Sequence, residues 1–164
     1  MTATEQYISV LTDLKQGDLS LLRQFSHKTL EQSVEGFDLF AGLWWPLRQR
    51  NQRAPRRQVA WLIAKLYAFC PLEHAPGAYF AKQMGLCKPY ETQALHRHTK
   101  RFNQLLVSPL EHLEVPLQWG LKWLENAKSQ VDWVRLTDQL SIWEREQTRL
   151  DWAQLYLTAI ERRR

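Results

Sequence analysis

The chain has 164 residues and a formal net charge of +5, with 45% hydrophobic and 24% charged residues. This is the balance of a soluble globular protein, long enough for one domain or for two small subdomains that share a core. The longest apolar stretch, residues 59–72, is interrupted by Lys65 and is too short to span a bilayer, which excludes a membrane-spanning protein.

Nearly every segment shows helical periodicity, and no stretch alternates like a strand. The first half predicts helices over about 4–15, from a cap at Asp18, over 29–44 and over 55–70. The last of these is apolar on almost all sides, which is typical of a helix at the centre of a core. The arginine-rich segment between Pro46 and Pro55 is interpreted as a loop.

The second half predicts loops around one short helix over 70–89, and then further helices over 90–106, from Ser108, from Pro116 and from Asp132, with a last one ending near Ile160. The expected fold class is all-α, a compact multi-helix bundle in one domain, 1–164. Two helical subdomains, 1–108 and 109–164, are the alternative. The chain ends in Arg162, Arg163 and Arg164, which we expect to lie in solvent.

The charge imbalance is local, because five arginines occur within ten positions: Arg48, Arg50, Arg53, Arg56 and Arg57. The remaining 17 Lys and Arg residues balance the 17 Asp and Glu residues. Arg56 and Arg57 fall in the first turn of the predicted central helix, where the helix dipole disfavours a cation by about 0.3–1 kcal/mol. An anion would reverse this cost, since free backbone N–H groups and guanidinium groups together suit phosphate. We therefore predict phosphate binding here, against the alternative of a solvated loop.

A second basic surface is predicted on the helix over 90–106. Arg97, Lys100 and Arg101 share one face of this helix, and no acidic residue between positions 92 and 109 offsets their repulsion. Such a face suits a nucleic-acid backbone, with a plain exposed face as the competing interpretation.

Two further residue pairs, Arg145/Arg149 and Trp44/Trp45, are weaker candidates for contacts with a nucleic acid. Arg145 and Arg149 are one helical turn apart, but acidic neighbours flank them, so ordinary surface pairing explains them as well as function does. Trp44 and Trp45 adjoin the arginine-rich segment and form the one tryptophan pair considered for stacking on a base.

Nothing in the sequence indicates catalysis, a metal or a cofactor. His96 and His98 are two positions apart and therefore point to different sides of a helix. No phosphate-binding loop, nucleophile or dinucleotide motif occurs. Cys70 and Cys87 form no metal or redox pattern, so we expect reduced thiols in a cytoplasmic protein. The N-terminus has neither a basic region nor an apolar run, and no signal peptide is expected.

Several short motifs run through most of the chain in a defined order. They are Gly17 before Leu21-Leu22-Arg23, the aromatic residues Phe37, Phe40 and Trp44, Pro55-Arg56, Lys100-Arg101-Phe102 with Leu105-Leu106, Val131-Asp132-Trp133, Trp143, and Trp152-Ala153 with Tyr156. In this order the chain resembles the CasB family, the small subunit of the type I-E CRISPR surveillance complex, Cascade.

The resemblance implies a non-catalytic all-α subunit that packs as two copies against the backbone subunits and near the large subunit of Cascade. Its basic faces are expected to hold CRISPR RNA, target DNA and the displaced strand, and so to stabilise the R-loop. The residues that the resemblance assigns to nucleic-acid contacts are Arg23, Arg56, Lys100, Arg101, Arg145 and Arg149. Gln118 and Trp119 stand where relatives often have two arginines, so the resemblance does not extend that role to their helix.

Two other functions stay open from the residues alone. A helical adaptor could use the basic patch to meet an acidic protein partner. A small helical enzyme acting on RNA or DNA is the third hypothesis, and the absence of an acid cluster or an activated nucleophile in the sequence speaks against it.

Overall fold

The computed structural model describes residues 1–30 and 34–162, apart from the side chains of residues 34 and 35. Within these ranges the chain is helical and has no strand, which confirms the predicted all-α class. No helix there has both the length and the apolar character needed to cross a membrane. Part of the predicted 29–44 helix, and Arg163 and Arg164, lie outside the described residues.

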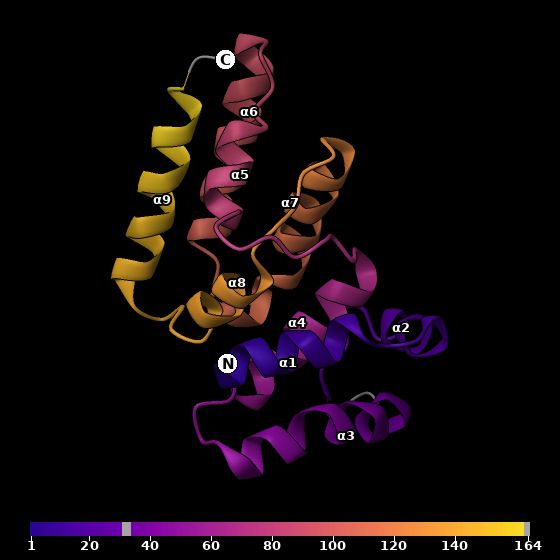
Figure 1. Cartoon of the computed structure of the whole chain (residues 1–164). Coiled ribbons are helices and arrows are strands. Elements are labelled where there is room, and N and C mark those ends of the chain that lie inside the picture. Colours follow the sequence, from indigo (N-terminus) through magenta and orange to yellow (C-terminus); the bar gives the residue numbers. More distant parts are fainter. Residues whose placement is uncertain (31–33, 163–164) are drawn as a thin grey trace. The chain divides into compact units, whose positions relative to one another are not determined.

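The chain divides into two compact units, an N-terminal unit over Met1–Pro71 and a C-terminal unit over Leu72–Arg164 (Figure 1). Ser108, near which the alternative boundary was predicted, lies inside the C-terminal unit. Whether the chain unfolds as one cooperative domain or as separate subdomains stays a prediction.

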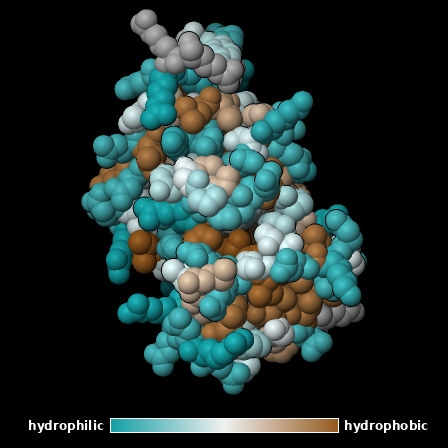
Figure 2. Space-filling model, viewed as in Figure 1, coloured by the Kyte–Doolittle hydropathy of each residue, from teal (hydrophilic) through white to brown (hydrophobic). Residues whose placement is uncertain are grey.

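Among its described residues, the N-terminal unit contains four α-helices: α1 (Ala3–Thr12), α2 (Gln16–Arg23), α3 (Val34–Arg50) and α4 (Arg57–Phe69). Helix α4 is buried on almost every side, which confirms its predicted place in the core. Helices α2 and α3 both pack on it, and α1 packs on α3. The buried hydroxyl of Tyr7 on α1 donates to the carbonyl oxygen of Ala60 on α4, at 2.6 Å. Figure 2 shows apolar side chains gathered among hydrophilic ones around α1 and α3.

The predicted start of α2 is wrong. The helix begins at Gln16, and its N-cap is Lys15, whose side chain makes no capping hydrogen bond. Gly17 and Asp18 therefore lie within the first turn instead of before it. The Asp18 carboxylate still favours this helix end, because it faces the positive end of the helix dipole.

The interpretation of the whole arginine-rich segment as a loop is also wrong. Helix α3 continues through Pro46 to Arg50, although a proline inside a helix removes one backbone hydrogen bond. Contacts from the side chains of this helix explain the continuation. The ring of Trp44 stacks on that of Phe40, with centroids 5.6 Å apart, and its Nε1 donates to the carbonyl oxygen of Pro55. Tertiary contacts thus outweigh the local signal of the proline.

The C-terminal unit contains five α-helices and one short 3₁₀ helix within the described residues. They are α5 (Phe80–Leu86), α6 (Thr92–Leu106), η2 (Leu110–His112), α7 (Glu114–Asn126), α8 (Trp133–Leu140) and α9 (Glu146–Ile160). As predicted, Asp132 caps α8, accepting a hydrogen bond from the backbone N–H of Arg135 at 2.9 Å. The fully buried indole of Trp133 donates to the carbonyl oxygen of Leu72, so a large aromatic side chain is buried without an unpaired polar atom.

The closest helix packing in this unit joins α5 to α9 through Gly85. A Cβ atom at Gly85 would lie 2.6 Å from the Cβ atom of Ala159 and 2.7 Å from the carbonyl oxygen of Tyr156. The second neighbour is backbone, which cannot rotate away as the end of a long side chain can. Glycine is therefore required for these two helices to approach each other.

Substitution Gly85→Ala is expected to lower the free energy of unfolding by about 1–2 kcal/mol, because the added methyl group forces α5 away from α9. The control is Gly17→Ala, since a Cβ atom at Gly17 would meet nothing within 4 Å and alanine favours a helix. Urea unfolding should show the first variant less stable than the parent chain and the second equally or more stable. Equal stability of the two variants would contradict this account of the packing.

Candidate nucleic-acid interface

The five clustered arginines all belong to the connection between α3 and α4. Arg48 and Arg50 lie in the last turn of α3, Arg53 lies in the link, Arg56 is the N-cap of α4, and Arg57 is its first residue. Helix α4 has no acidic residue in its first turn and no side-chain cap at its start. The helix end is therefore cationic in both its side chains and its dipole.

Arg48 stabilises this connection from within. Its Nη1 donates to the carbonyl oxygens of Gln52 and Ala54, at 2.8 Å and 2.6 Å. Together with the bond from Trp44 to Pro55, these contacts tie residues 52–55 to the end of α3. These hydrogen bonds hold the link in place. The structural role of Arg48 could not be distinguished in the sequence from the roles of the other four arginines.

Arg50, Arg53 and Arg57 are exposed, whereas Arg56 is half-buried. The Nε of Arg50 donates to the carbonyl oxygen of Pro46 at 3.2 Å, and the backbone N–H of Arg53 donates to Oδ1 of Asn51 at 2.9 Å. Over residues 1–30 and 34–162, no carboxylate forms an ion pair with Arg48, Arg50 or Arg53. The connection therefore presents cationic side chains to solvent, as a phosphate-binding surface would.

Arg23 is also exposed, but it is the last residue of α2. In Figure 1, α2 lies toward one end of the N-terminal unit and the α3–α4 connection lies toward the other. The structure thus does not bring Arg23 to the five clustered arginines.

In the C-terminal unit, Arg97, Lys100 and Arg101 are exposed on the outer face of α6. Their opposite face carries the buried side chains of Phe102 and Leu105. The guanidinium carbon of Arg101 lies 4.9 Å from the ring centroid of Trp119 on α7. This contact fixes the position of one cation and leaves the edge of its guanidinium group for an acceptor.

Arg145 and Arg149 lie at the start of α9. Arg145 is the exposed N-cap, and Arg149 is half-buried. Glu146 stands in the same first turn, as the sequence indicated. This pair lies on α9, which packs on α6, and within the described residues no hydrogen bond or ring contact joins it to Arg97, Lys100 or Arg101.

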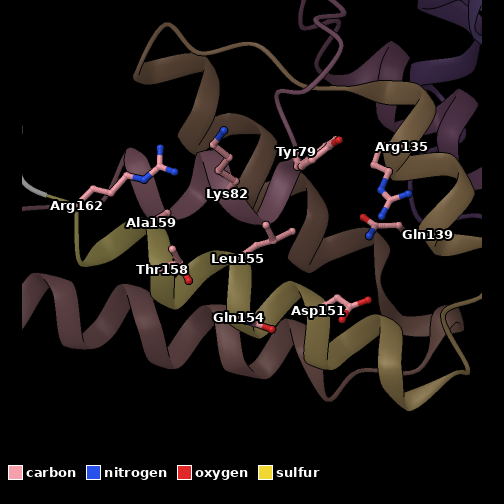
Figure 3. A pocket seen from close by; sticks show the side chains of 10 residues that line it. All are labelled: Tyr79, Lys82, Arg135, Gln139, Asp151, Gln154, Leu155, Thr158, Ala159 and Arg162. Atoms are coloured by element: carbon pink, nitrogen blue, oxygen red, sulfur yellow. The ribbon is translucent and has the colours of Figure 1, made fainter.

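Three basic residues surround a pocket of about 330 Å³ in the C-terminal unit: Lys82 and Arg135, which sequence analysis did not single out, and the exposed Arg162 of the terminal triplet. Figure 3 shows Lys82 on α5, Arg135 on α8 and Arg162 after α9 around it, with Asp151 as the acidic residue of its lining. The guanidinium carbon of Arg135 lies 5.5 Å from the ring centroid of Tyr79. No local pattern could reveal this group, because its members come from three separate elements. Its excess of cations suits an anionic group.

His98 lies in an aromatic cluster behind the basic face of α6. Its side chain is 3% exposed, its Nδ1 is 2.8 Å from the hydroxyl of Tyr156, and its ring centroid is 4.7 Å from that of Trp123. Its Nε2 is buried and has no hydrogen-bond partner within the described residues. Burial lowers the pKa of His98 to about 4, so the ring is neutral near pH 7.

His96, by contrast, is exposed, which confirms that the two histidines point to different sides of the helix. Within residues 1–30 and 34–162, no group of three or more His, Cys, Asp and Glu side chains is placed to hold a metal ion.

Comparison with solved structures shows the same fold. CasB from Thermus thermophilus has a TM-score of 0.71 at 19% identity, over 97% of this chain and 100% of that chain. CasB from M. ruber has a TM-score of 0.76 at 16% identity, over 97% of this chain and 94% of that chain. CasB from Thermobifida fusca has a TM-score of 0.69 at 17% identity, over 94% of each.

At the level of sequence, no curated protein matches the chain. The model of one family, described as CRISPR-associated protein Cse2, matches residues 18–156, which is more than half of the chain. This match and the shared fold confirm the resemblance found in the ordered motifs. The chain therefore belongs to the CRISPR-associated protein Cse2 family.

Proposed function

We propose that this chain is a non-catalytic small subunit of a type I-E CRISPR surveillance complex, and that its basic faces bind phosphate backbones. The observation that carries the proposal is the α3–α4 connection, where exposed arginines surround a helix start that has no acidic residue in its first turn. A sugar–phosphate strand at this place would turn an unfavourable arrangement of charge into a favourable one.

In this function the sequence of the target DNA is recognised by base pairing with CRISPR RNA, and the subunit stabilises the paired and displaced strands electrostatically. The exchange of a DNA duplex for an RNA–DNA duplex is nearly balanced in free energy, so a few phosphate contacts can shift it. The basic faces of the N-terminal and C-terminal units would hold the guide–target duplex and the displaced strand. The partners are then the backbone and large subunits, a second copy of this chain, and both nucleic acids.

The salt dependence of binding tests the electrostatic part of this proposal. Anisotropy of a labelled 30-nucleotide single-stranded DNA, titrated with the full chain in buffers of increasing KCl, should give weaker binding at each step. Three to five phosphate contacts predict that log K falls with log salt at a slope of roughly −2 to −3.5. Unlabelled DNA should displace the probe, whereas poly-glutamate should not. Displacement by poly-glutamate alone would instead support the adaptor function.

Membership of a complex needs a separate measurement. A tagged copy of the chain should co-purify with a multisubunit particle that contains short RNA. Recovery of the chain without RNA and without other subunits would contradict the proposed assembly.

A further inference from the structure

The two adjacent tryptophans of α3 have different surroundings. Trp44 is half-buried, its ring stacks on Phe40, and its Nε1 is bonded to the carbonyl oxygen of Pro55. Trp45 is 49% exposed, and its ring lies 5.8 Å from that of Trp44 at an interplanar angle of 47°. Trp44 therefore stabilises the link to α4, whereas about half of the Trp45 side chain is exposed to solvent.

The place of Trp45 connects this open indole to the clustered arginines. It lies three positions before Arg48, which is within one helical turn and on the same side of α3. One turn before it stands Ala41, and a Cβ atom at the neighbouring Gly42 would meet nothing within 4 Å. The indole is thus bordered by small residues on one side and by the cationic connection on the other.

An exposed indole beside a cluster of arginine side chains suits a ligand with both a flat ring and an anionic backbone. We propose that Trp45 stacks on an unpaired base of a single-stranded nucleic acid whose phosphates lie along the α3–α4 connection. Stacking on an aromatic side chain requires a base that is free of its own pair, so the strand is single in this place. This inference rests on the proposed function, since it uses the same arginines for the phosphates.

Phe37 provides a matched control within the same helix. It is 54% exposed, about as much as Trp45, and lies about two turns earlier on α3. Its neighbour Asp38 is exposed and negatively charged, which disfavours a phosphate there. If exposed aromatic surface alone held the ligand, the two positions would behave alike. If the base is held beside the arginines, only Trp45 matters.

The experiment compares the full-length parent chain with Trp45→Ala, Trp45→Phe and Phe37→Ala. Each is titrated into a labelled single-stranded DNA and into an abasic strand with the same number of phosphates. Trp45→Ala should bind the base-bearing strand about 5- to 10-fold more weakly, with an unchanged salt slope. Trp45→Phe should keep most of the affinity, and Phe37→Ala should keep all of it. Neither alanine variant should change binding to the abasic strand.

The abasic strand keeps the test decisive even if a variant is unstable. The parent chain itself should bind that strand more weakly, and thermal unfolding of each variant checks its fold. Equal affinity of the parent chain for the two strands, or equal losses for Trp45→Ala and Phe37→Ala, would overturn the inference. The inference would also be overturned if Trp45→Ala bound DNA normally but failed to join the multisubunit particle, since the indole would then contact a protein.

The same titrations distinguish failure of this inference from failure of the proposed function. If the parent chain showed no salt-dependent DNA binding, the proposed function would be overturned and this inference with it. If binding were salt-dependent but insensitive to Trp45, only the inference would be overturned.

Discussion

The variant Arg50→Glu, Arg53→Glu, Arg57→Glu is expected to lose most of its affinity for single-stranded DNA, by about two orders of magnitude at low salt. These three arginines are exposed in the α3–α4 connection, and the hydrogen bonds that tie residues 52–55 to the end of α3 come from Trp44 and Arg48. Arg48 is left in place because it bonds two carbonyl oxygens of that link, and Arg56 because it is half-buried. The slope of log K against log salt should become shallower by about 2 units, since each contact to single-stranded DNA contributes about 0.7.

The same variant should be as stable as the parent chain or more stable, although it binds DNA more weakly. A glutamate at the first residue of α4 faces the positive end of the helix dipole, which is worth about 0.3–1 kcal/mol. DNA binding should therefore weaken while the unfolding temperature holds or rises. A general loss of structure would lower both, so the two measurements together separate a lost ligand site from a damaged fold.

A second variant controls for net charge. Lys15→Glu, Lys28→Glu, Lys122→Glu changes the total charge by the same amount at exposed positions that do not belong to the α3–α4 connection. It should keep a steep salt dependence and most of the affinity. If both variants lost affinity equally, binding would depend on the charge of the whole chain, and the α3–α4 connection would have no special role.

The arginine-rich connection could be predicted because its charge is a local property of the sequence. Five cations within ten positions stand out without any knowledge of packing. The central place of α4 was predictable for a similar reason, since a helix that is apolar on all sides has to be surrounded. Both features are set by neighbouring residues, which is the range over which sequence patterns are informative.

Other features depend on contacts between distant residues and could not be predicted. The continuation of α3 through Pro46 relies on a bond from Trp44 to Pro55, eleven positions away. The same bond is what distinguishes Trp44 from Trp45, which look alike in the sequence. The cations around the pocket of the C-terminal unit are brought together only when α5, α8 and α9 pack.

His98 is expected to make the folded chain less stable as the pH falls from about 6.5 to 4. In the unfolded chain a histidine has a pKa near 6.5, whereas burial lowers the pKa of His98 to about 4 in the folded chain. Between pH 6.5 and pH 4 the unfolded chain binds a proton at this histidine and the folded chain does not, so protonation favours unfolding. The difference of about 2.5 units corresponds to about 3 kcal/mol at pH 4 and below, and to about 2 kcal/mol between pH 7 and pH 5.

The variant His98→Phe should remove this loss. A phenyl ring keeps the packing against Trp123, and the hydroxyl of Tyr156 keeps its contact with Thr99 at 2.8 Å. Since other groups also titrate, the useful quantity is the difference between the unfolding free energies of the parent chain and the variant, measured in urea at pH 7, 6 and 5. On going from pH 7 to pH 5, the variant should become more stable relative to the parent chain by about 2 kcal/mol. Parallel curves for the parent chain and His98→Phe would show that His98 accepts a proton in the folded state, and hence that the aromatic cluster behind the basic face of α6 is open to water.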